Sequence, residues 1–172
     1  MLAKDVFVLP NNKNIILAAE QAKALSKRKL HIIPSHNIPQ GLSAVLAFNP
    51  EDSVSNNETN MNDAMQYVRA GMVTYAVRST QVDNFDLKEG DIIGIDSKSI
   101  VAKGENVNKV TTELIDKMMD DEVTNITLYF GNNVSEEEAT LIADDLAGKY
   151  KKCDVDIHFG GQPLYYYIVS LE

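Results

Sequence analysis

Two short apolar runs open the chain, and a polar loop follows each of them. Residues 6–9 form the first run and residues 30–33 form the second. Continuous apolar runs of this length are typical of strands that are buried on both faces of a parallel sheet. Between the two runs, apolar residues recur at helical spacing from Ile15 to Leu25. The pattern therefore predicts a strand–helix–strand unit with a right-handed crossover.

Amide and hydroxyl side chains fill the loops that follow these two strands. The first loop spans residues 11–14, and the second spans residues 34–40 and leads into a helical pattern over 42–48. Asparagine caps helices well, because its side-chain oxygen accepts from the free N–H groups of a first turn. Both loops follow adjacent parallel strands, so we expect them to lie side by side at the edge where open α/β sheets commonly bind ligands. A capped helix without any ligand is the simpler interpretation of the first loop.

The rest of the chain alternates between helical and strand patterns. Residues 51–60 are polar and predict a surface loop, closed by Thr59 or Asn60 as the cap of a helix that ends at a left-handed Gly71. The further elements predicted are a strand over 73–80, a hairpin over 91–102, a helix over 106–118, a strand over 125–131, a helix over 135–150 that opens with a capping box, and strands over 154–159 and 164–171.

The last two predicted strands differ in their pattern of apolar residues. Val155, Ile157 and Phe159 alternate with polar residues and are expected to point inward. The strand over 164–171 is apolar on both faces, which predicts a central position, and the short link before it predicts an antiparallel pair. The fold class expected is α/β: a mostly parallel sheet with flanking helices and an antiparallel C-terminal strand pair. The 172 residues suffice for a single module over 1–172 or for two lobes divided near 82–90.

Composition and charge narrow the function classes. The net charge of −9 opposes nucleic acid or an anionic membrane surface as a partner. A lone cysteine, Cys153, cannot form an internal disulfide. The apolar runs are far too short to span a membrane, and the N-terminus lacks the pattern of a signal peptide. We therefore expect a cytoplasmic protein without a membrane span.

The chain lacks the usual motifs of phosphate, metal or nucleophile chemistry. No glycine-rich phosphate loop is present, and histidines and Cys153 are scattered without the spacing of zinc ligands. Ser35 is next to His36, but no third residue is identifiable to orient the imidazole. We therefore expect no catalytic residue, no bound metal and no cofactor. Amides and hydroxyls at strand ends remain, and such groups suit a partner's backbone or a small polar ligand.

Four segments also carry a family resemblance. Residues 9–16, 38–48, 73–80 and 161–167 resemble, in fixed order, the C-terminal region of the catalytic A subunit of bacterial fatty acid kinase, in a staphylococcal-type sequence. The resemblance implies a DegV-like fold. In that family the full-length protein also has an ATP-binding domain, similar to the dihydroxyacetone kinase L subunit (the DAK2 type), and a middle dimerising domain. The chain would then be one module of a larger multidomain kinase.

The resemblance also implies a partner. The family transfers a phosphoryl group from ATP to the carboxylate of a fatty acid held in a separate DegV-like subunit, giving acyl phosphate for phospholipid synthesis. The C-terminal domain is thought to dock that subunit. The chain lacks the nucleotide domain and its magnesium-binding aspartates, so ATP and magnesium are implied only for the missing kinase domain. The expected role of this chain is to dock the acyl-binding subunit without taking part in catalysis. The remaining domains of the kinase are its other expected partners.

Two alternatives stay open from the sequence. The chain could instead be a DegV-like module that itself binds a fatty acid or small acidic ligand. An autonomous kinase or hydrolase ranks last, because the phosphate-handling motifs are missing. Tyrosine and arginine dominate interface energetics, so they join the two polar loops as candidates. The candidate partner- or ligand-binding residues are Asn11, Asn12, Lys13, Asn14, Ser35, Pro39, Gln40, Gly41, Tyr75, Arg78 and Gln162.

Overall fold

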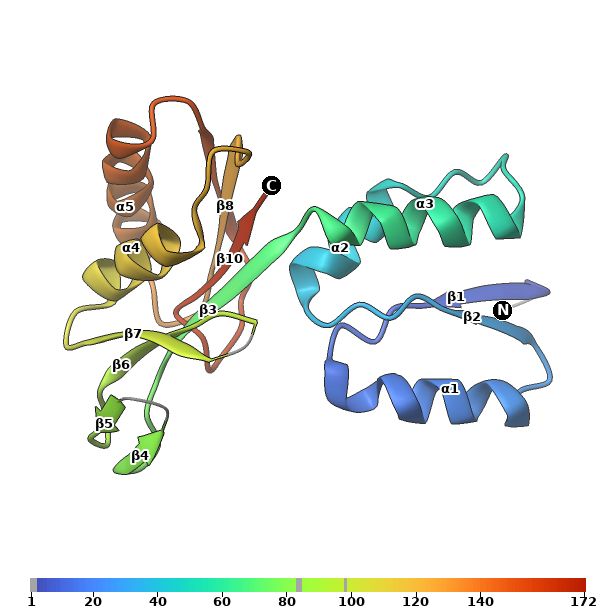
Figure 1. The fold of residues 1–172 in the computed structure, drawn as a ribbon, viewed down its shortest axis with the longest axis horizontal. Coiled ribbons are helices and arrows are strands. Elements are labelled where there is room, and N and C mark those ends of the chain that lie inside the picture. The colour runs from blue at the N-terminus through green and yellow to red at the C-terminus, as the bar shows by residue number, and fades with distance from the viewer. Residues whose placement is uncertain (1–2, 83–84, 98) are drawn as a thin grey trace. The chain divides into compact units, whose positions relative to one another are not determined.

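The computed structural model describes residues 3–82, 85–97 and 99–172, and it divides into two compact units (Figure 1). The first unit is Met1–Val68 and the second is Arg69–Glu172. The sequence left open a single module or two lobes divided near 82–90, and the two units of the structure divide between Val68 and Arg69; Asp83 and Asn84 lie outside the described residues. Arg69 already belongs to a paired strand, so no loop of turn-forming residues marks the boundary in the sequence.

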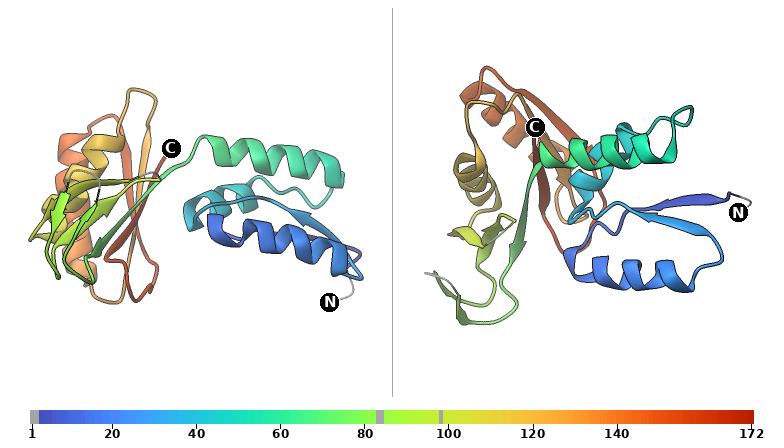
Figure 2. Two further views of the ribbon diagram at one scale, coloured as in Figure 1. Left: turned by 60° about the horizontal axis from the view of Figure 1, so that its bottom comes forward. Right: turned by 45° about the vertical axis from the view of Figure 1, so that its right-hand side comes forward.

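The first unit contains the predicted strand–helix–strand arrangement. Its elements are β1 (Asp5–Val8), η1 (Lys13–Ile15), α1 (Ile16–Leu25), β2 (Lys29–Ile32), α2 (Ile38–Leu46) and α3 (Val54–Gln66). β1 and β2 are parallel neighbours, with Val6 opposite Leu30, which confirms the prediction for this unit. Figures 1 and 2 show α1 on one side of the strand pair and α3 on the other.

The core of this unit lies on the α2–α3 side of the strands. Ile33, Ala44, Met61 and Met65 are buried there, and Phe7 and Leu9 pack against them. α1, by contrast, contributes no residue to the core among those described, and Leu25 is 88% exposed. The apolar spacing predicted the helix but not its burial. Most of the apolar positions in α1 are alanines, and burial of so small a side chain gains little hydrophobic free energy.

Helix α3 corrects the predicted loop over 51–60 and the predicted cap at Thr59 or Asn60, because both of these residues lie inside the helix. It begins at Val54, with Ser53 accepting the N–H of Asn56 (3.1 Å), so the loop predicted over 51–60 is wrong for most of its length. The cause is Asn57, which is 2% exposed and braces the preceding turn. Its Oδ1 accepts the N–H of Asn49 (2.7 Å), and its Nδ2 donates to the Asn49 carbonyl (2.8 Å). A buried asparagine on the inner face removes the apolar periodicity on which the prediction depended.

The second unit contains a large sheet covered by two helices. Its elements are β3 (Arg69–Tyr75), β4 (Thr80–Val82), β5 (Phe85–Leu87), β6 (Ile92–Ile95), β7 (Ile100–Gly104), α4 (Val107–Met118), β8 (Asn125–Phe130), α5 (Glu136–Lys149), β9 (Asp154–Phe159) and β10 (Tyr167–Leu171). Within the described residues, six strands form one sheet in the order β7-β6-β3-β10-β8-β9, and β4 pairs with β5 separately.

The prediction of a mostly parallel sheet is wrong for this unit. Among the described strands of the large sheet, β8 and β9 form the parallel pair, and every other neighbouring pair is antiparallel. The hairpin predicted over 91–102 is confirmed as β6–β7, although Lys98 in its turn lies outside the described residues. Sequence periodicity identifies strands, but it does not state which strands become neighbours.

The C-terminal strand β10 has the central position that its apolar faces predicted. It lies between β3 and β8 and is antiparallel to both, so β8 separates it from β9 and the predicted strand pair is not hydrogen-bonded. Residues 160–166 join β9 to β10 and cross the end of β8; we call this segment the link before β10. There the N–H of Gly131 donates to the Tyr166 carbonyl (2.9 Å), and the N–H of Asn132 donates to the Gln162 carbonyl (3.1 Å).

Three smaller expectations fail in the same unit. Gly71 lies inside β3 opposite Val169 and does not have a left-handed conformation. The strand predicted over 73–80 is divided, because β3 ends at Tyr75 and β4 starts at Thr80. Phe159 is 67% exposed at the end of an edge strand, whereas Val155 and Ile157 pack against the core as expected.

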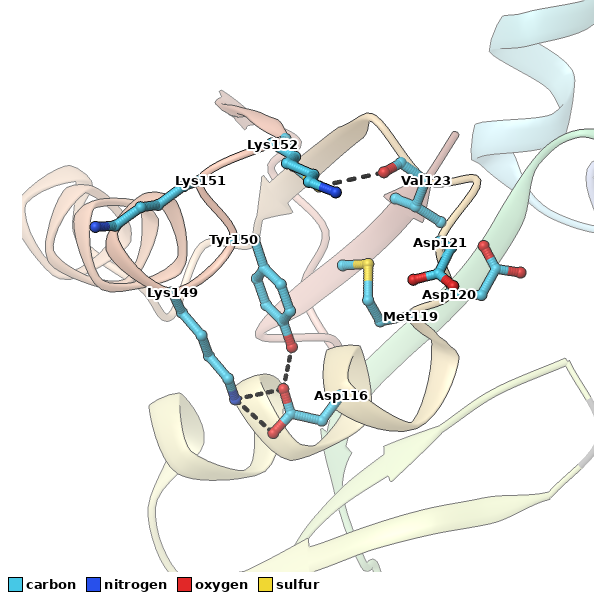
Figure 3. Close-up of a pocket in the computed structure, with 10 residues that line it drawn as sticks. Asp116, Met119, Asp120, Asp121, Val123, Lys149, Tyr150, Lys151 and Lys152 are labelled. Carbon is cyan, nitrogen blue, oxygen red and sulfur yellow. Dashed lines mark hydrogen bonds and ion pairs between the residues drawn. The ribbon is translucent and has the colours of Figure 1, made fainter.

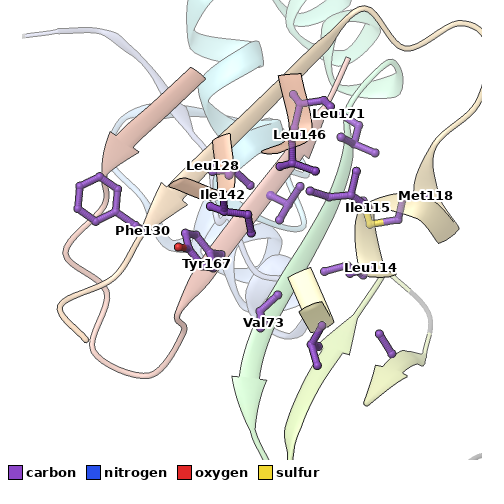
Figure 4. Close-up of a cluster of buried hydrophobic side chains, with 14 of the residues drawn as sticks. Val73, Leu114, Ile115, Met118, Leu128, Phe130, Ile142, Leu146, Tyr167 and Leu171 are labelled. Carbon is purple, nitrogen blue, oxygen red and sulfur yellow. The ribbon is translucent and has the colours of Figure 1, made fainter. Parts of the chain in front are cut away.

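α4 and α5 pack against one face of the large sheet and enclose its core (Figure 4). Leu114 and Ile115 of α4, Leu146 of α5 and Val169 of β10 are each at most 1% exposed. Tyr167 lies in the same cluster, fully buried, and its hydroxyl has no hydrogen-bond partner among the described residues. Burial raises the pKa of Tyr167 to about 12, so this hydroxyl remains protonated at neutral pH.

Tyr167→Phe is expected to stabilise the second unit. Removing a buried hydroxyl that lacks a partner relieves a desolvation cost, so the free energy of unfolding should rise by about 1 kcal/mol. Urea unfolding followed by tyrosine fluorescence measures this change. Tyr166→Phe is a suitable control, because Tyr166 is only partly buried. A loss of stability in Tyr167→Phe would mean that the hydroxyl has a partner, such as a buried water molecule.

Candidate functional site

The two polar loops of the first unit meet, as the sequence predicted. Asn11 follows β1 and Ser35 follows β2, at the carboxyl ends of two parallel strands. The backbone N–H of Asn11 donates to Ser35 Oγ (3.0 Å), and the Ser35 hydroxyl donates to Asn11 Oδ1 (2.7 Å). Ser35 is completely buried. We call the group of Asn11, Ser35 and Gly41 the corner.

Gly41 completes the corner from α2. A Cβ atom at this position would lie 2.0 Å from Asn11 Oδ1, far inside any contact distance, so the Asn11 side chain rests directly on the glycine. Asn11 has a φ of 54°, in the left-handed region that asparagine tolerates better than most residues. The Asn11 side chain is therefore held by a hydroxyl on one side and by the first turns of α2 on the other.

The neighbouring amides cap helices. Asn12 Oδ1 accepts the N–H of Asn14 (2.9 Å) at the start of η1, and Asn37 Oδ1 accepts the N–H of Gln40 (3.0 Å) at the start of α2. Gln40 Oε1 in turn accepts the N–H of His36 (2.8 Å). Asn37 was not among the sequence candidates, although an asparagine directly before Ile-Pro is a recognisable helix start.

The remaining two candidates of these loops differ in exposure. Pro39 is buried in the first turn of α2, where its fixed φ suits the helix. Lys13 is exposed in η1 and, among the described residues, has no side-chain hydrogen bond or ion pair. Lys13 is therefore available to a partner in a way that Asn11, Ser35 and Gly41 are not.

The corner has no acid–base chemistry of its own. The Ser35 hydroxyl donates to a neutral amide oxygen, which cannot take its proton as a general base would. Among the described residues, no three histidine, cysteine, aspartate or glutamate side chains are grouped as a metal site would require. The corner can therefore position backbone and shape a surface, but it does not activate a nucleophile.

The other three candidates lie in the second unit, at the end of the large sheet. The Tyr75 ring packs edge-on against Tyr166, with ring centroids 6.3 Å apart. Gln162 Nε2 donates to the Tyr129 carbonyl (2.7 Å), so this amide braces the link before β10. Arg78 is exposed just beyond β3. Of the three, Arg78 is the side chain without an internal role among the described residues.

An open hollow of about 650 Å³ lies where α4 and α5 end (Figure 3). Lys149 Nζ lies 2.5 Å from Asp116 Oδ1, and the Tyr150 hydroxyl donates to the same carboxylate. Burial and this hydrogen bond raise the pKa of Tyr150 above its ordinary value. The ion pair with Arg69 lowers the pKa of Asp120. The charges of Asp116, Asp120 and Lys149 are therefore paired within the unit.

Comparison with known proteins identifies the family. The model of the fatty acid kinase A-subunit-like C-terminal family matches residues 1–172. The chain belongs to this family. It is 43% identical over 170 residues to protein YloV of Bacillus subtilis, covering 99% of this chain and 31% of YloV. The chain thus spans about a third of the length of this relative.

Solved structures show the fold of this family member. A DegV family protein from Corynebacterium glutamicum matches 98% of this chain and 74% of its own length, with a TM-score of 0.66 and 15% identity. The Streptococcus pneumoniae fatty acid kinase B3 protein, solved with linoleic acid, matches 99% of this chain and 72% of its own length, with a TM-score of 0.64 and 11% identity. The DegV-like α/β fold implied by the resemblance is confirmed.

No helix in the described part of this family member is both long enough and apolar enough to cross a membrane.

Proposed function

We propose that this chain is a non-catalytic docking module of a fatty acid kinase. It would bind the DegV-like subunit that carries the fatty acid and present it to the kinase domain. Membership of the family supports this proposal, as does the chain's coverage of only 31% of YloV, which leaves room for other domains in such proteins. The proposed partners are therefore the remainder of the kinase and the acyl-binding subunit.

The observation that carries the proposal is the filled corner. In open α/β sheets, the loops at the carboxyl ends of parallel strands are the expected place for a ligand. Here the Ser35 hydroxyl both donates to and accepts from Asn11, and the Asn11 side chain lies against Gly41. Two donors that could hold a carboxylate, the Asn11 N–H and the Ser35 hydroxyl, are thus satisfied within the chain. With these donors occupied, the corner does not favour enclosure of a small acid, and contact with a folded partner at the exposed residues around it remains.

The mechanism proposed is proximity. Docking would hold the fatty acid carboxylate near the γ-phosphate of ATP, and such positioning can contribute several kcal/mol to catalysis. ATP and magnesium would belong to the kinase domain, which would form the acyl phosphate for phospholipid synthesis. The described residues of this chain have no grouped metal ligands. Phosphoryl transfer would therefore be carried out by the kinase domain and not by this chain's own side chains.

The exposed candidates should carry the contacts. Lys13 and Arg78 are exposed. Arginine is enriched among the residues that dominate interface energy. In an assay of a full-length kinase of this family with its acyl-binding partner, an excess of this chain should inhibit acyl phosphate formation by competing for that partner. Arg78→Ala should weaken the inhibition about tenfold, and Lys13→Ala less.

Lys117→Ala is the matched control for this competition, because Lys117 is also exposed but lies on the last turn of α4. It should inhibit as well as the unaltered chain. The proposal fails if an excess of the folded chain leaves acyl phosphate formation unchanged.

The second candidate function is direct binding of a fatty acid or small acidic ligand. The DegV-like fold favours it, because the structurally similar B3 protein was solved with linoleic acid. Solvent extraction of the purified chain followed by mass spectrometry distinguishes the two functions. A stoichiometric fatty acid would favour this second function, whereas the filled corner predicts a chain without bound lipid.

A further inference from the structure

His31 lies between two carboxylates in the first unit. Its Nε2 is 3.0 Å from Asp5 Oδ1, and its Nδ1 is 2.8 Å from Glu58 Oε1. A neutral imidazole has one N–H, so it can donate to only one of these oxygens. The imidazolium form donates from both nitrogens and satisfies both carboxylates. The geometry therefore favours the doubly protonated ring.

The three residues belong to three different elements. Asp5 begins β1, His31 lies in β2 and Glu58 lies in the first half of α3. The His31 side chain is 15% exposed, while those of Asp5 and Glu58 are 35% and 39% exposed. The Phe7 ring covers one side of the imidazole, with ring centroids 5.2 Å apart. The ring is thus enclosed between a strand, a helix and an aromatic side chain.

We propose that protonated His31, by binding Asp5 and Glu58 together, holds α3 against β1 and β2, so that the local stability of α3 decreases as the pH rises. We call this group of three side chains the pin. This role is independent of docking and of the corner's chemistry. It is a property of the first unit alone, because all three residues lie before Val68.

The electrostatics support the proposal. Burial lowers the pKa of His31, but the hydrogen bonds and charges of Asp5 and Glu58 outweigh burial, and the pKa is raised above 6.5. Among the described residues, Asp5 from β1 and Glu58 from α3 are the charged groups that act on the ring. A raised pKa contributes stability that is complete below about 6.5 and disappears as the pH rises through the folded-state pKa.

A loss of local stability in α3 should also lower the local stability of α2. The Ser43 hydroxyl of α2 donates to the Ala64 carbonyl of α3 (3.2 Å), and Ala44 of α2 shares its core with Met61 and Met65 of α3. Gly41 lies on the same α2 helix and contacts Asn11. The pin is therefore connected to the corner through α3 and then α2. Deprotonation of His31 should lower the protection of α3 amides before it affects α2.

Amide hydrogen exchange tests the pin. Protection factors of α3 amides, corrected for the pH dependence of intrinsic exchange, are measured between pH 5.5 and 8.5 in the unaltered chain and in His31→Gln. Glutamine keeps a polar side chain but does not titrate. Protection in the unaltered chain should fall as the pH rises, because the stability contributed by the protonated ring is lost. His31→Gln should lack this fall.

His158→Gln is the matched control, because His158 is also a strand histidine but is exposed and stacks on Tyr129. It should keep the fall in α3 protection. An NMR titration of the unaltered chain adds a readout that does not depend on folding of a variant, and the His31 ring should titrate above 6.5. The pin is excluded if His31 titrates at or below 6.5, or if α3 protection in the folded His31→Gln protein falls as in the unaltered chain.

Discussion

Gly41→Ala is expected to lower the free energy of unfolding of the first unit by about 3 kcal/mol. The new Cβ would lie 2.0 Å from Asn11 Oδ1, so the Asn11 side chain must leave its position. Its departure removes the hydrogen bond from the completely buried Ser35 hydroxyl. Overpacking costs about 1–3 kcal/mol, and an unsatisfied buried hydroxyl costs about 1–3 kcal/mol. Urea unfolding, with hydrogen exchange of α2 amides as the local probe, measures the loss.

A second substitution tests whether Asn11 is the cause. Asn11→Gly removes the obstructing side chain and also suits the left-handed φ of 54°. The double variant Asn11→Gly, Gly41→Ala should therefore recover part of the stability that Gly41→Ala loses. Gly148→Ala is the control, because nothing lies within 4 Å of a Cβ at that helical position. A Gly41→Ala protein as stable as the unaltered chain would contradict the packing of the corner.

Gly131→Ala should destabilise the second unit by a similar amount, about 3 kcal/mol. A Cβ at Gly131 would lie 2.2 Å from the Tyr165 carbonyl oxygen and 2.6 Å from the Gln162 carbonyl oxygen. Both obstacles are main-chain atoms, so no side-chain rotation relieves the clash. The link before β10 must move, and its hydrogen bonds to Gly131 and Asn132 weaken as a result. Urea unfolding followed by tyrosine fluorescence reports on this unit.

Gln162→Ala provides the comparison for Gly131→Ala. It removes the hydrogen bond from Nε2 to the Tyr129 carbonyl but leaves the path of the link unobstructed. Its cost should be about 1 kcal/mol, well below that of Gly131→Ala. If Gln162→Ala proves the more damaging of the two, the amide and not the close backbone approach determines the path of the link.

Sequence patterns predicted the local structure of this chain better than its sheet topology. The parallel pair β1–β2, the hairpin β6–β7 and the central position of β10 all follow from runs of apolar residues and short links. The mostly parallel sheet was wrong, because β6 pairs antiparallel with β3 and with β7, and β10 inserts antiparallel between β3 and β8. Such an insertion joins strands that are far apart in the chain, and side-chain periodicity contains no information about it.

Helix α3 shows a different limit. Its inner face includes Asn57, whose amide braces the turn before the helix. A buried polar residue is stable when its hydrogen bonds are satisfied, and its partners are visible only in three dimensions. The same reason explains why the partners of His31 could not be predicted from the sequence. Its partners, Asp5 and Glu58, are 26 and 27 residues away in the sequence.

The corner was the most predictable part of the site. Two polar loops after adjacent parallel strands had to meet, and Asn11 and Ser35 do meet. The sequence did not predict that these side chains would satisfy each other, nor that Gly41 would be required beneath Asn11. These features depend on interatomic distances, which the spacing of residues along a chain does not determine.

The most direct test of the docking proposal is isothermal titration of this chain with a DegV-family fatty-acid-binding protein from the same genome, loaded with a fatty acid. The proposal predicts saturable 1:1 binding with a Kd of about 50 µM or tighter, equivalent to about −6 kcal/mol. Arg78→Ala should weaken this binding, and Lys117→Ala should leave it unchanged. A folded chain that shows no binding at concentrations several times above this Kd, with any such protein of that genome, would contradict the docking function.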